Sequence, residues 1–247
     1  MTTQNETLFP RPLSGVAVTD LPSALVPGRT PLVGRHVQLE PLNPALHAEA
    51  LYEASHLTEE GRAIWTYLPD GPWPDLAAYT SQLRRLSGSV DRVFHIIRAG
   101  AEGSVSGQAS FMDIDAGNGV IEIGYIWFAP SLQRTRAATE ALYLMLDHAM
   151  TALRYRRMQW RCNALNAKSR GAARRLGFRF EGIFHNHLIY KGLNRDTAWY
   201  SILDDEWPEV RAILEEWLDD ANFDAQGQAR RSLTVMMQDR TPSTRAR

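Results

Sequence analysis

VIEIGYIWFAPSLQRTRAATEALYLMLDHAM, residues 120–150, is the stretch that decides the fold. Its first part, Val120 to Phe128, is apolar and rich in β-branched and aromatic residues, which predicts a buried strand. Pro130 cannot donate a hydrogen bond to a sheet, so the strand must end before it. From about Thr135 the apolar residues recur with the period of a helix. The stretch therefore predicts a strand, a tight loop and the start of a helix.

The loop between this strand and this helix has the features of a phosphate-binding site. The residues directly around the helix start are Gln133, Arg134, Thr135 and Arg136. The first turn of a helix carries backbone N–H groups without partners and a partial positive charge, and such a helix start binds anions. Two arginines beside it add further positive charge. We therefore predict that residues 133–138 hold the phosphate groups of a ligand.

The same residues resemble the cofactor motif of the GNAT superfamily of acyl-CoA-dependent N-acyltransferases, in which Gln/Arg-x-x-Gly-x-Gly/Ala joins a strand to a helix. Gln133 and Ala138 match that motif, whereas Arg136 stands where a glycine is usual. A second signature, Asn166-Ala167-Lys168-Ser169 followed by Leu176-Gly177-Phe178, resembles the RimJ/RimL-type branch. In that branch the asparagine and the serine line the pantetheine arm of the cofactor. Asn166 could also cap the helix that follows it.

The resemblance implies an N-acetyltransferase that uses acetyl-CoA as cosubstrate and no metal. The amine would attack the thioester carbonyl directly, while backbone N–H groups near 126–128 hold that carbonyl. The acceptor would be a primary amine, either a protein N-terminal α-amino group or a small amine or amino acid. The implied cofactor contacts are Trp127, Phe128, Gln133, Arg134, Thr135, Arg136, Ala137, Ala138, Asn166 and Ser169.

Glu122 and Ser169 are the candidate catalytic residues. Attack needs a neutral amine, and because amines have pKa values of about 8–10, a general base is useful. Glu122 precedes Gln133 by eleven residues, which is the spacing of the base glutamate in the histone-acetylating branch of the superfamily. A glutamate on this strand could instead pair with an arginine. Many GNAT enzymes protonate the departing thiolate with a tyrosine four residues after the serine. Ala173 occupies that position here, so Ser169 or water must act, or the thiolate leaves unaided.

The remaining pattern predicts an α/β layered domain whose mixed, mostly antiparallel central sheet is flanked by helices, as in the GNAT fold. We expect an extended N-terminal arm over 1–31, a GNAT-like acyltransferase domain over 32–204, an amphipathic C-terminal helix over 205–221 and a flexible tail over 222–247. Within the domain, 185–194 is predicted to be the end of a strand and a loop.

The composition narrows the class of protein. A formal net charge of −1 gives no general reason to expect nucleic acid as a partner. The single cysteine, Cys162, excludes a disulfide within the chain and fits a reducing, cytoplasmic setting. No apolar run reaches the ~18–20 residues of a membrane helix, so we expect no membrane partner. A homodimer is left open. The rival function is a non-catalytic GNAT-like module that senses acyl-CoA or binds RNA through the basic residues of 154–180.

Three features of the sequence each allow two interpretations. The basic stretch 154–180 and the acidic stretch 204–220 are either two solvated faces that attract each other or, for the first, a polyanion site. His185 and His187 have a spacing that suits a metal, but no third ligand is evident. A set of aromatic residues either walls an acceptor pocket or caps the core; it consists of Trp65, Tyr67 and Trp73.

Overall fold

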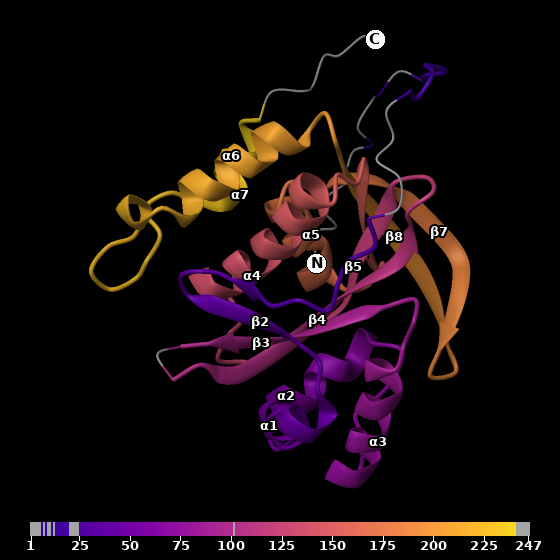
Figure 1. Cartoon of the computed structure of the whole chain (residues 1–247), viewed down its shortest axis with the longest axis vertical. Coiled ribbons are helices and arrows are strands. Elements are labelled where there is room, and N and C mark those ends of the chain that lie inside the picture. The colour runs from indigo at the N-terminus through magenta and orange to yellow at the C-terminus, as the bar shows by residue number, and fades with distance from the viewer. Residues whose placement is uncertain are drawn as a thin grey trace.

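The structure, a computed structural model, describes residues 6, 8, 11, 13–19, 25–100 and 102–240. They build an eight-stranded sheet with helices on both faces (Figure 1). The strands are β1 (Leu32–Val33), β2 (Val37–Pro41), β3 (Val93–Ala99), β4 (Ser104–Asp115), β5 (Val120–Phe128), β6 (Arg157–Asn163), β7 (Arg179–Tyr190) and β8 (Leu193–Leu203). Their order is β1-β2-β3-β4-β5-β6-β8-β7, and every neighbouring pair is antiparallel except β5 with β6. The predicted mixed, mostly antiparallel sheet is confirmed.

The helices divide between the two faces of the sheet (Figure 1). On one face lie α1 (Pro44–His56), α2 (Glu59–Ala63), the 3-10 turn η1 (Ile64–Tyr67) and α3 (Leu76–Ser87). On the other lie α4 (Arg136–Asp147), which continues as the π-helical turn η2 (His148–Ala152), then α5 (Ala167–Arg175), α6 (Trp207–Leu218), the short turn η3 (Asp220–Asn222) and α7 (Leu233–Gln238). None of the helices in the described part of the chain is long and apolar enough to cross a membrane.

Local sequence signals mark the ends of several of these helices. Asn43 caps α1 by accepting a hydrogen bond from the backbone N–H of Ala45, and Pro44 takes the first helical position. Asp75 caps α3 in the same way through the N–H of Ala78. At the other end of a helix, Gly177 follows α5 with a φ of 94°, a conformation that glycine adopts without strain.

The strand β5 separates two hydrophobic cores. Ile121 and Ile123 belong to the core under α4, whereas Trp127 belongs to the core under α1 and α3. Side chains alternate along a strand, so Glu122 and Gly124 face the α1–α3 side. The carboxylate of Glu122 therefore lies on the face of the sheet that α1 and α3 cover.

The hairpin of β7 and β8 is longer than predicted. The stretch 185–194, predicted as a strand end and loop, belongs to the two strands except for a turn at Lys191 and Gly192. Both turn residues have positive φ values, 51° and 76°, as tight hairpin turns require. The prediction was wrong because β7 is an edge strand with no fully buried residue, and it therefore lacks the apolar alternation that reveals a strand.

The C-terminal region is more ordered than predicted. The amphipathic helix α6 packs Trp207, Val210, Leu214 and Trp217 into the core, as its spacing indicates. Residues 222–240, predicted as part of a flexible tail, instead include α7, whose Leu233, Met236 and Met237 are buried. A helix of six residues shows too little periodicity to be recognised in sequence. Residues 241–247 of the predicted tail lie outside the described residues.

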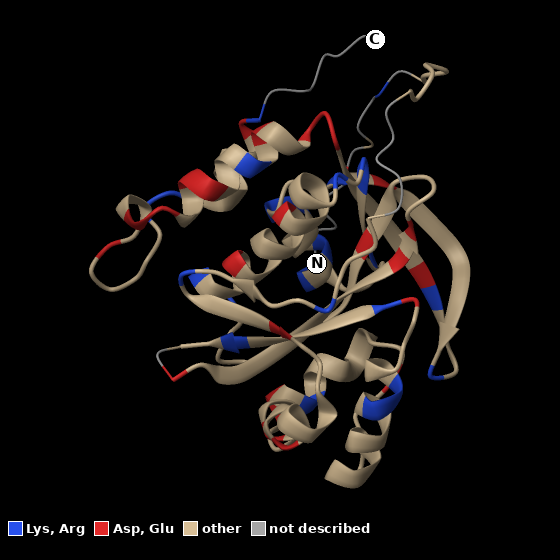
Figure 2. Ribbon diagram, viewed as in Figure 1, with Lys and Arg blue, Asp and Glu red and all other residues tan. Residues whose placement is uncertain are grey.

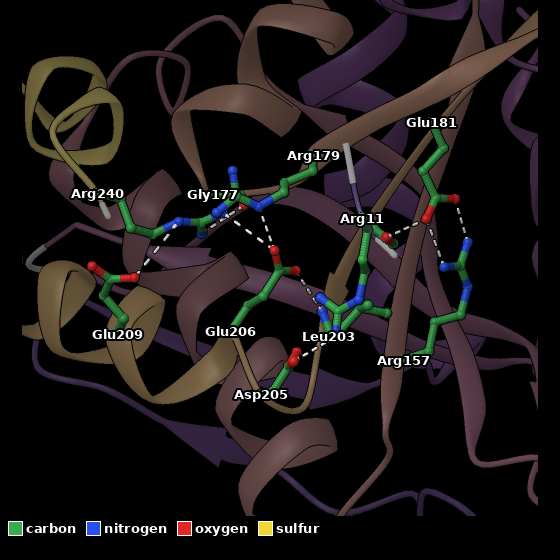
Figure 3. A network of polar contacts seen from close by, with 11 residues as sticks. Arg11, Arg157, Gly177, Arg179, Glu181, Leu203, Asp205, Glu206, Glu209 and Arg240 are labelled. Carbon is green, nitrogen blue, oxygen red and sulfur yellow. Dashed lines mark hydrogen bonds and ion pairs between the residues drawn. The ribbon is translucent and has the colours of Figure 1, made fainter. Parts of the chain in front are cut away.

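Charged side chains from the basic and acidic stretches meet in a network beside α6 (Figure 3). The carboxylate of Glu206, on a side chain that is 2% exposed, pairs with Arg179 and accepts a hydrogen bond from the backbone N–H of Leu203. Arg240 donates to the carbonyl of Gly177 at 3.0 Å. The predicted attraction between the stretches 154–180 and 204–220 is therefore real at this place. Figure 2 shows basic and acidic residues interspersed over this part of the molecule.

Candidate active site

The central strand separates from its parallel neighbour soon after it begins. β5 pairs with β6 only where Val120–Glu122 faces Arg157–Gln159. Further along, Tyr125 has a φ of 51°, and the register between β4 and β5 shifts between Gln108 and Ser110. This irregularity is a bulge, which bends a strand and increases its twist. The backbone of β5 after Glu122 is therefore not paired with β6.

A cavity of about 470 Å³ lies where the two strands separate. Sites for small molecules have volumes of about 300–1,000 Å³. The walls of this cavity come from five separate parts of the chain: η1 with its following loop, Arg92 before β3, β4 with β5, β6 with the start of α5, and the β7–β8 hairpin. The polar lining includes Tyr67, Asp70, Glu122, Asn166, Ser169 and Arg195.

Glu122 lies in this cavity with its carboxylate almost entirely buried. The residue is 3% exposed, and its carboxylate accepts a hydrogen bond from Nε of Arg161, which also pairs with Asp113. Burial raises the pKa of Glu122, Arg161 opposes that shift and Asp113 adds to it, so the pKa reaches about 7. Glu122 therefore lines the cavity and also pairs with an arginine, which was the alternative interpretation of this residue.

Gly124 keeps room for this carboxylate. A Cβ atom at this position would lie 2.4 Å from Sδ of Met112 and 3.0 Å from Oε1 of Glu122. The first distance is too short for non-bonded heavy atoms and the second is tight, so a side chain here would displace the end of Met112 and press on the carboxylate of Glu122. Gly124 therefore leaves the space that the carboxylate of Glu122 occupies.

The start of α5 presents Asn166 and Ser169 to the same cavity. Asn166 caps the helix, since its Oδ1 accepts a hydrogen bond from the N–H of Ser169 at 3.1 Å. The hydroxyl of Ser169 accepts one from Nε1 of Trp160 at 3.0 Å. An indole nitrogen only donates, so Ser169 can donate its own hydroxyl hydrogen, and the buried sulfur of Cys162 lies within its reach. Ala173 is fully buried in the core below α5, where a tyrosine would not fit without rearrangement.

The predicted phosphate loop has the expected strand–loop–helix form. α4 begins at Arg136, and Thr135 caps it by accepting a hydrogen bond from the N–H of Ala138 at 3.1 Å. Gln133 turns back toward the strand, because its side-chain amide donates to the carbonyl of Phe128 at 3.0 Å. Arg134 is exposed and has a φ of 63°. The backbone thus turns sharply just before the helix.

Arg136 does not point where the sequence analysis placed it. We expected its guanidinium to face the phosphates of a cofactor or the basic stretch 154–180. It instead donates to the carbonyl of Leu218, pairs with Asp220 at 2.6 Å and lies 4.1 Å above the ring of Phe223. The side chain therefore fastens the segment after α6 to the start of α4. The prediction for this side chain is wrong because η3 brings an acidic partner that is far away in sequence.

Some of the predicted cofactor contacts do not lie in the cavity that contains Glu122 and Ser169. Thr135, Arg136 and Ala137 line a second, more open groove of about 890 Å³, which also receives the β1–β2 turn and the β3–β4 hairpin. That groove does not include Glu122 or Ser169. Trp127 is 2% exposed and its ring packs 5.6 Å from that of Trp65 in the α1–α3 core. Only its backbone is therefore available to a ligand.

Trp65, Tyr67 and Trp73 were predicted either to wall an acceptor pocket or to cap the core, and the structure divides them between the two. Trp65 is 1% exposed and belongs to the α1–α3 core, and Trp73 packs against it with ring centres 4.9 Å apart. Tyr67 lines the cavity and directs its hydroxyl toward the carbonyl of Leu165 at 3.4 Å. One residue of the set therefore walls the cavity and two fill the core.

Several cavity residues were not selected from the sequence. Asp70 accepts hydrogen bonds from the hydroxyl of Tyr125 at 2.7 Å and from the side-chain amide of Gln82 at 3.1 Å. Tyr190 and Arg195 project from the β7–β8 hairpin, which was predicted in part as a loop. No local motif marks these residues. Asp70 could be found only from the packing of its loop against Tyr125 of β5, and Tyr190 and Arg195 only from the pairing of β8 with β6 and β7.

The two histidines of the hairpin do not act together. His185 is exposed and its Nδ1 lies 3.1 Å from Asp196, whereas His187 lines the cavity with Nδ1 at 3.0 Å from the hydroxyl of Thr197. Within the described residues no three His, Cys, Asp or Glu side chains are grouped so that they could hold a metal ion.

Comparisons with known proteins agree with this geometry. Residues 36–179 match the acetyltransferase (GNAT) domain family. A GCN5-related N-acetyltransferase from Brucella melitensis is 42% identical in sequence; the match covers 86% of this chain and 96% of that one, with a TM-score of 0.83. A structure from Chromobacterium violaceum, described as a candidate GNAT acetyltransferase, is 35% identical over 81% and 98% of the two chains, with a TM-score of 0.74.

A relative from Bacillus subtilis, YdaF, is named as a candidate ribosomal N-acetyltransferase. It is 28% identical over 187 residues, which is 71% of this chain and 95% of the relative. This similarity supports the resemblance to the RimJ/RimL-type branch. Because the matching family covers more than half of the sequence, the chain belongs to the GNAT family of acetyltransferases.

Proposed function

We propose that this acetyltransferase transfers the acetyl group of acetyl-CoA to a primary amine by direct attack, with Glu122 as the general base. The observation that carries the proposal is the position of Glu122. Its buried carboxylate lines a cavity at the point where β5 and β6 separate, and its pKa is raised to about 7. A general base works best when its pKa lies near the operating pH.

The chain offers groups that fit the phosphate end of acetyl-CoA. The first turn of α4 begins directly after β5, and its early N–H groups have no partners within the helix. Thr135 satisfies the N–H of Ala138, which leaves the amides of Arg136 and Ala137 for an anion. The exposed guanidinium of Arg134 supplies positive charge beside them. These contacts through the backbone do not require the guanidinium of Arg136.

Asn166 and Ser169 are suited to the thioester end. Acetyl-CoA supplies an activated acetyl group on a thiol leaving group. Ser169 is held by the hydrogen bond from Trp160, and its own hydroxyl hydrogen would turn from the sulfur of Cys162 to the sulfur that departs. A thiol with a pKa somewhat above the ~8.5 of cysteine leaves without strong acid help. Ser169 would therefore contribute a hydrogen bond rather than a full proton transfer.

Deprotonation of the acceptor is the task of Glu122. An ammonium group entering the cavity meets a carboxylate that is charged in a substantial fraction of molecules at neutral pH. Arg161 binds that carboxylate from one side and fixes its orientation. The acceptor is either a protein N-terminal α-amino group or a small amine or amino acid.

A thiol-release assay with acetyl-CoA tests this function. The acceptors would be a panel of small amines, free amino acids and peptides with free N-termini, and the product would be identified by mass spectrometry. We expect thiol release that depends on the acceptor and a product heavier by one acetyl group. Release of thiol at the same rate with and without every acceptor would overturn the proposal.

A further inference from the structure

Arg195 is a buried cation without a hydrogen-bonding partner in the described part of the chain. It is 8% exposed, belongs to β8 and lines the cavity that contains Glu122. Its Nε is buried and makes no hydrogen bond. The guanidinium lies over an aromatic ring, with its central carbon 4.4 Å from the centre of the Tyr190 ring.

Other arginines that are largely withdrawn from solvent have a specific partner. Arg161 pairs with Glu122 and Asp113, Arg170 with Glu6, and Arg179 with Glu206. A guanidinium presents five N–H donors and does not lose its proton in proteins. Leaving such a group buried and unpaired is costly, so proteins normally supply an anion to it. Arg195 departs from this pattern, and it does so in the wall of the active site.

The anions nearest to the cavity are already engaged. Glu122 is bound by Arg161, and Asp70 accepts hydrogen bonds from Tyr125 and Gln82. The charged side chains in the lining are three arginines and two carboxylates: Arg92, Arg161, Arg195, Asp70 and Glu122. Arg161 also pairs with Asp113, and Arg92 lies 3.9 Å from Asp91. Arg195 is therefore the arginine of the lining that has no ion pair among the described residues, and its charge acts on Glu122 only at longer range.

We propose that the amine acceptor carries a carboxylate, which Arg195 binds while Glu122 receives the proton of the amine. This inference rests on the proposed acetyl transfer and names its substrate class. A planar guanidinium binds a carboxylate through two parallel hydrogen bonds, which would orient the acceptor as well as hold it. The carboxylate could be the α-carboxylate of a free amino acid or the side chain of an acidic residue at the N-terminus of a peptide.

Matched acceptors test the proposal on the unaltered protein. The first pair is two peptides that begin with glutamate or glutamine and are otherwise identical; the second is an amino acid and its carboxamide. We expect kcat/KM to be about 10- to 100-fold higher for the carboxylate member of at least one pair, the range of a charged hydrogen bond that is lost. The pair that shows the preference identifies the source of the carboxylate.

Substitution of Arg195 separates this preference from differences in amine basicity. Arg195→Gln should reduce the carboxylate-to-amide ratio toward one, and Arg195→Lys should keep part of it. Arg156→Gln changes an exposed arginine outside the cavity and should keep the wild-type ratio. Dividing the ratio of each variant by that of the wild type cancels the intrinsic reactivity of the acceptors.

Different results would overturn the role of Arg195 and the proposed acetyl transfer. Acetylation of both members of each pair with equal kcat/KM would overturn the role of Arg195 and leave acetyl transfer intact. A wild-type preference that survives unchanged in Arg195→Gln would also overturn it. No acetylation of any acceptor would overturn the proposed function and this inference with it.

Discussion

The two ends of the candidate site are built in different ways. The phosphate loop is a continuous stretch, 129–138, whose hydrogen bonds connect neighbours such as Gln133 with Phe128 and Thr135 with Ala138. The acceptor cavity instead takes residues from 64–70, 112–126, 160–169 and 187–197, together with Arg92. A local structure tolerates change elsewhere in the chain, whereas an assembled cavity depends on every element that contributes a wall. The two ends should therefore respond differently to mutation and to ligand.

The largest effect is expected in the assembled cavity, at Glu122. Glu122→Gln should lower turnover by ~10²–10⁴-fold while acetyl-CoA affinity stays near that of the wild type. Glutamine keeps the shape of the side chain but cannot accept a proton. Turnover should be measured from pH 6 to 10 together with the Kd of acetyl-CoA.

The pH profile of Glu122→Gln distinguishes base catalysis from structural damage. In the wild type, the charged fraction of a base with a pKa of about 7 grows as the pH rises through that value, so kcat/KM should rise there too. The deficit of the variant should shrink at high pH, where more of the amine is already neutral. A deficit that is constant across the range would exclude Glu122 as the base, and His187 in the cavity wall would be examined next.

Acetyl-CoA should stabilise the folded chain through the loop end of the site. A ligand at 100 times its Kd that binds only the folded state adds about 2.7 kcal/mol to the free energy of unfolding. The measurement is a thermal melt at increasing acetyl-CoA, with acetyl-pantetheine as the control that lacks the adenosine phosphates. Equal shifts from both compounds would mean that 133–138 does not hold the phosphates, and no shift at millimolar acetyl-CoA would remove the cosubstrate.

Arg136 connects the loop to the C-terminal segment, so its removal should affect stability rather than affinity. Arg136→Met loses the contacts with Leu218 and the ring of Phe223 and should lower the Tm by about 2–4 °C. The Kd of acetyl-CoA should change little. Arg134→Met is the matched control: its exposed guanidinium lies beside the proposed phosphate site, so it should weaken acetyl-CoA binding with little change in Tm. If Arg136→Met instead weakened acetyl-CoA binding and left the Tm unchanged, the side chain of Arg136 would belong to the cofactor site.

The smallest effect is expected from the cap of α4. Thr135→Ala removes the acceptor for the N–H of Ala138 and should lower the free energy of unfolding by ~1 kcal/mol. Thr135→Ser keeps the hydroxyl and should retain most of the wild-type stability in urea unfolding. Loss of stability in both variants would assign the effect to the methyl group, not to the cap.

Sequence periodicity predicted most of the secondary structure because each element carries its own signal. β5 has the predicted bounds, α6 lies within the predicted range 205–221, and Asn166 caps α5 as the sequence allowed. The failures lie where that signal is weak: the edge strand β7 and the six-residue helix α7. Their structure depends on neighbours supplied by distant parts of the chain.

The sequence by itself determined the strand–loop–helix around residue 130, the choice of Glu122 and Ser169 as candidates, and the family resemblance, because these depend on residues close together in the chain. Only the tertiary structure decided that Arg136 faces Asp220, that Glu122 is bound by Arg161, and that Arg195 lines the same cavity without an ion-pair partner among the described residues. The reason is that charge pairing and burial depend on distances through space. Residues separated by tens of positions meet only after the sheet has set its order and register.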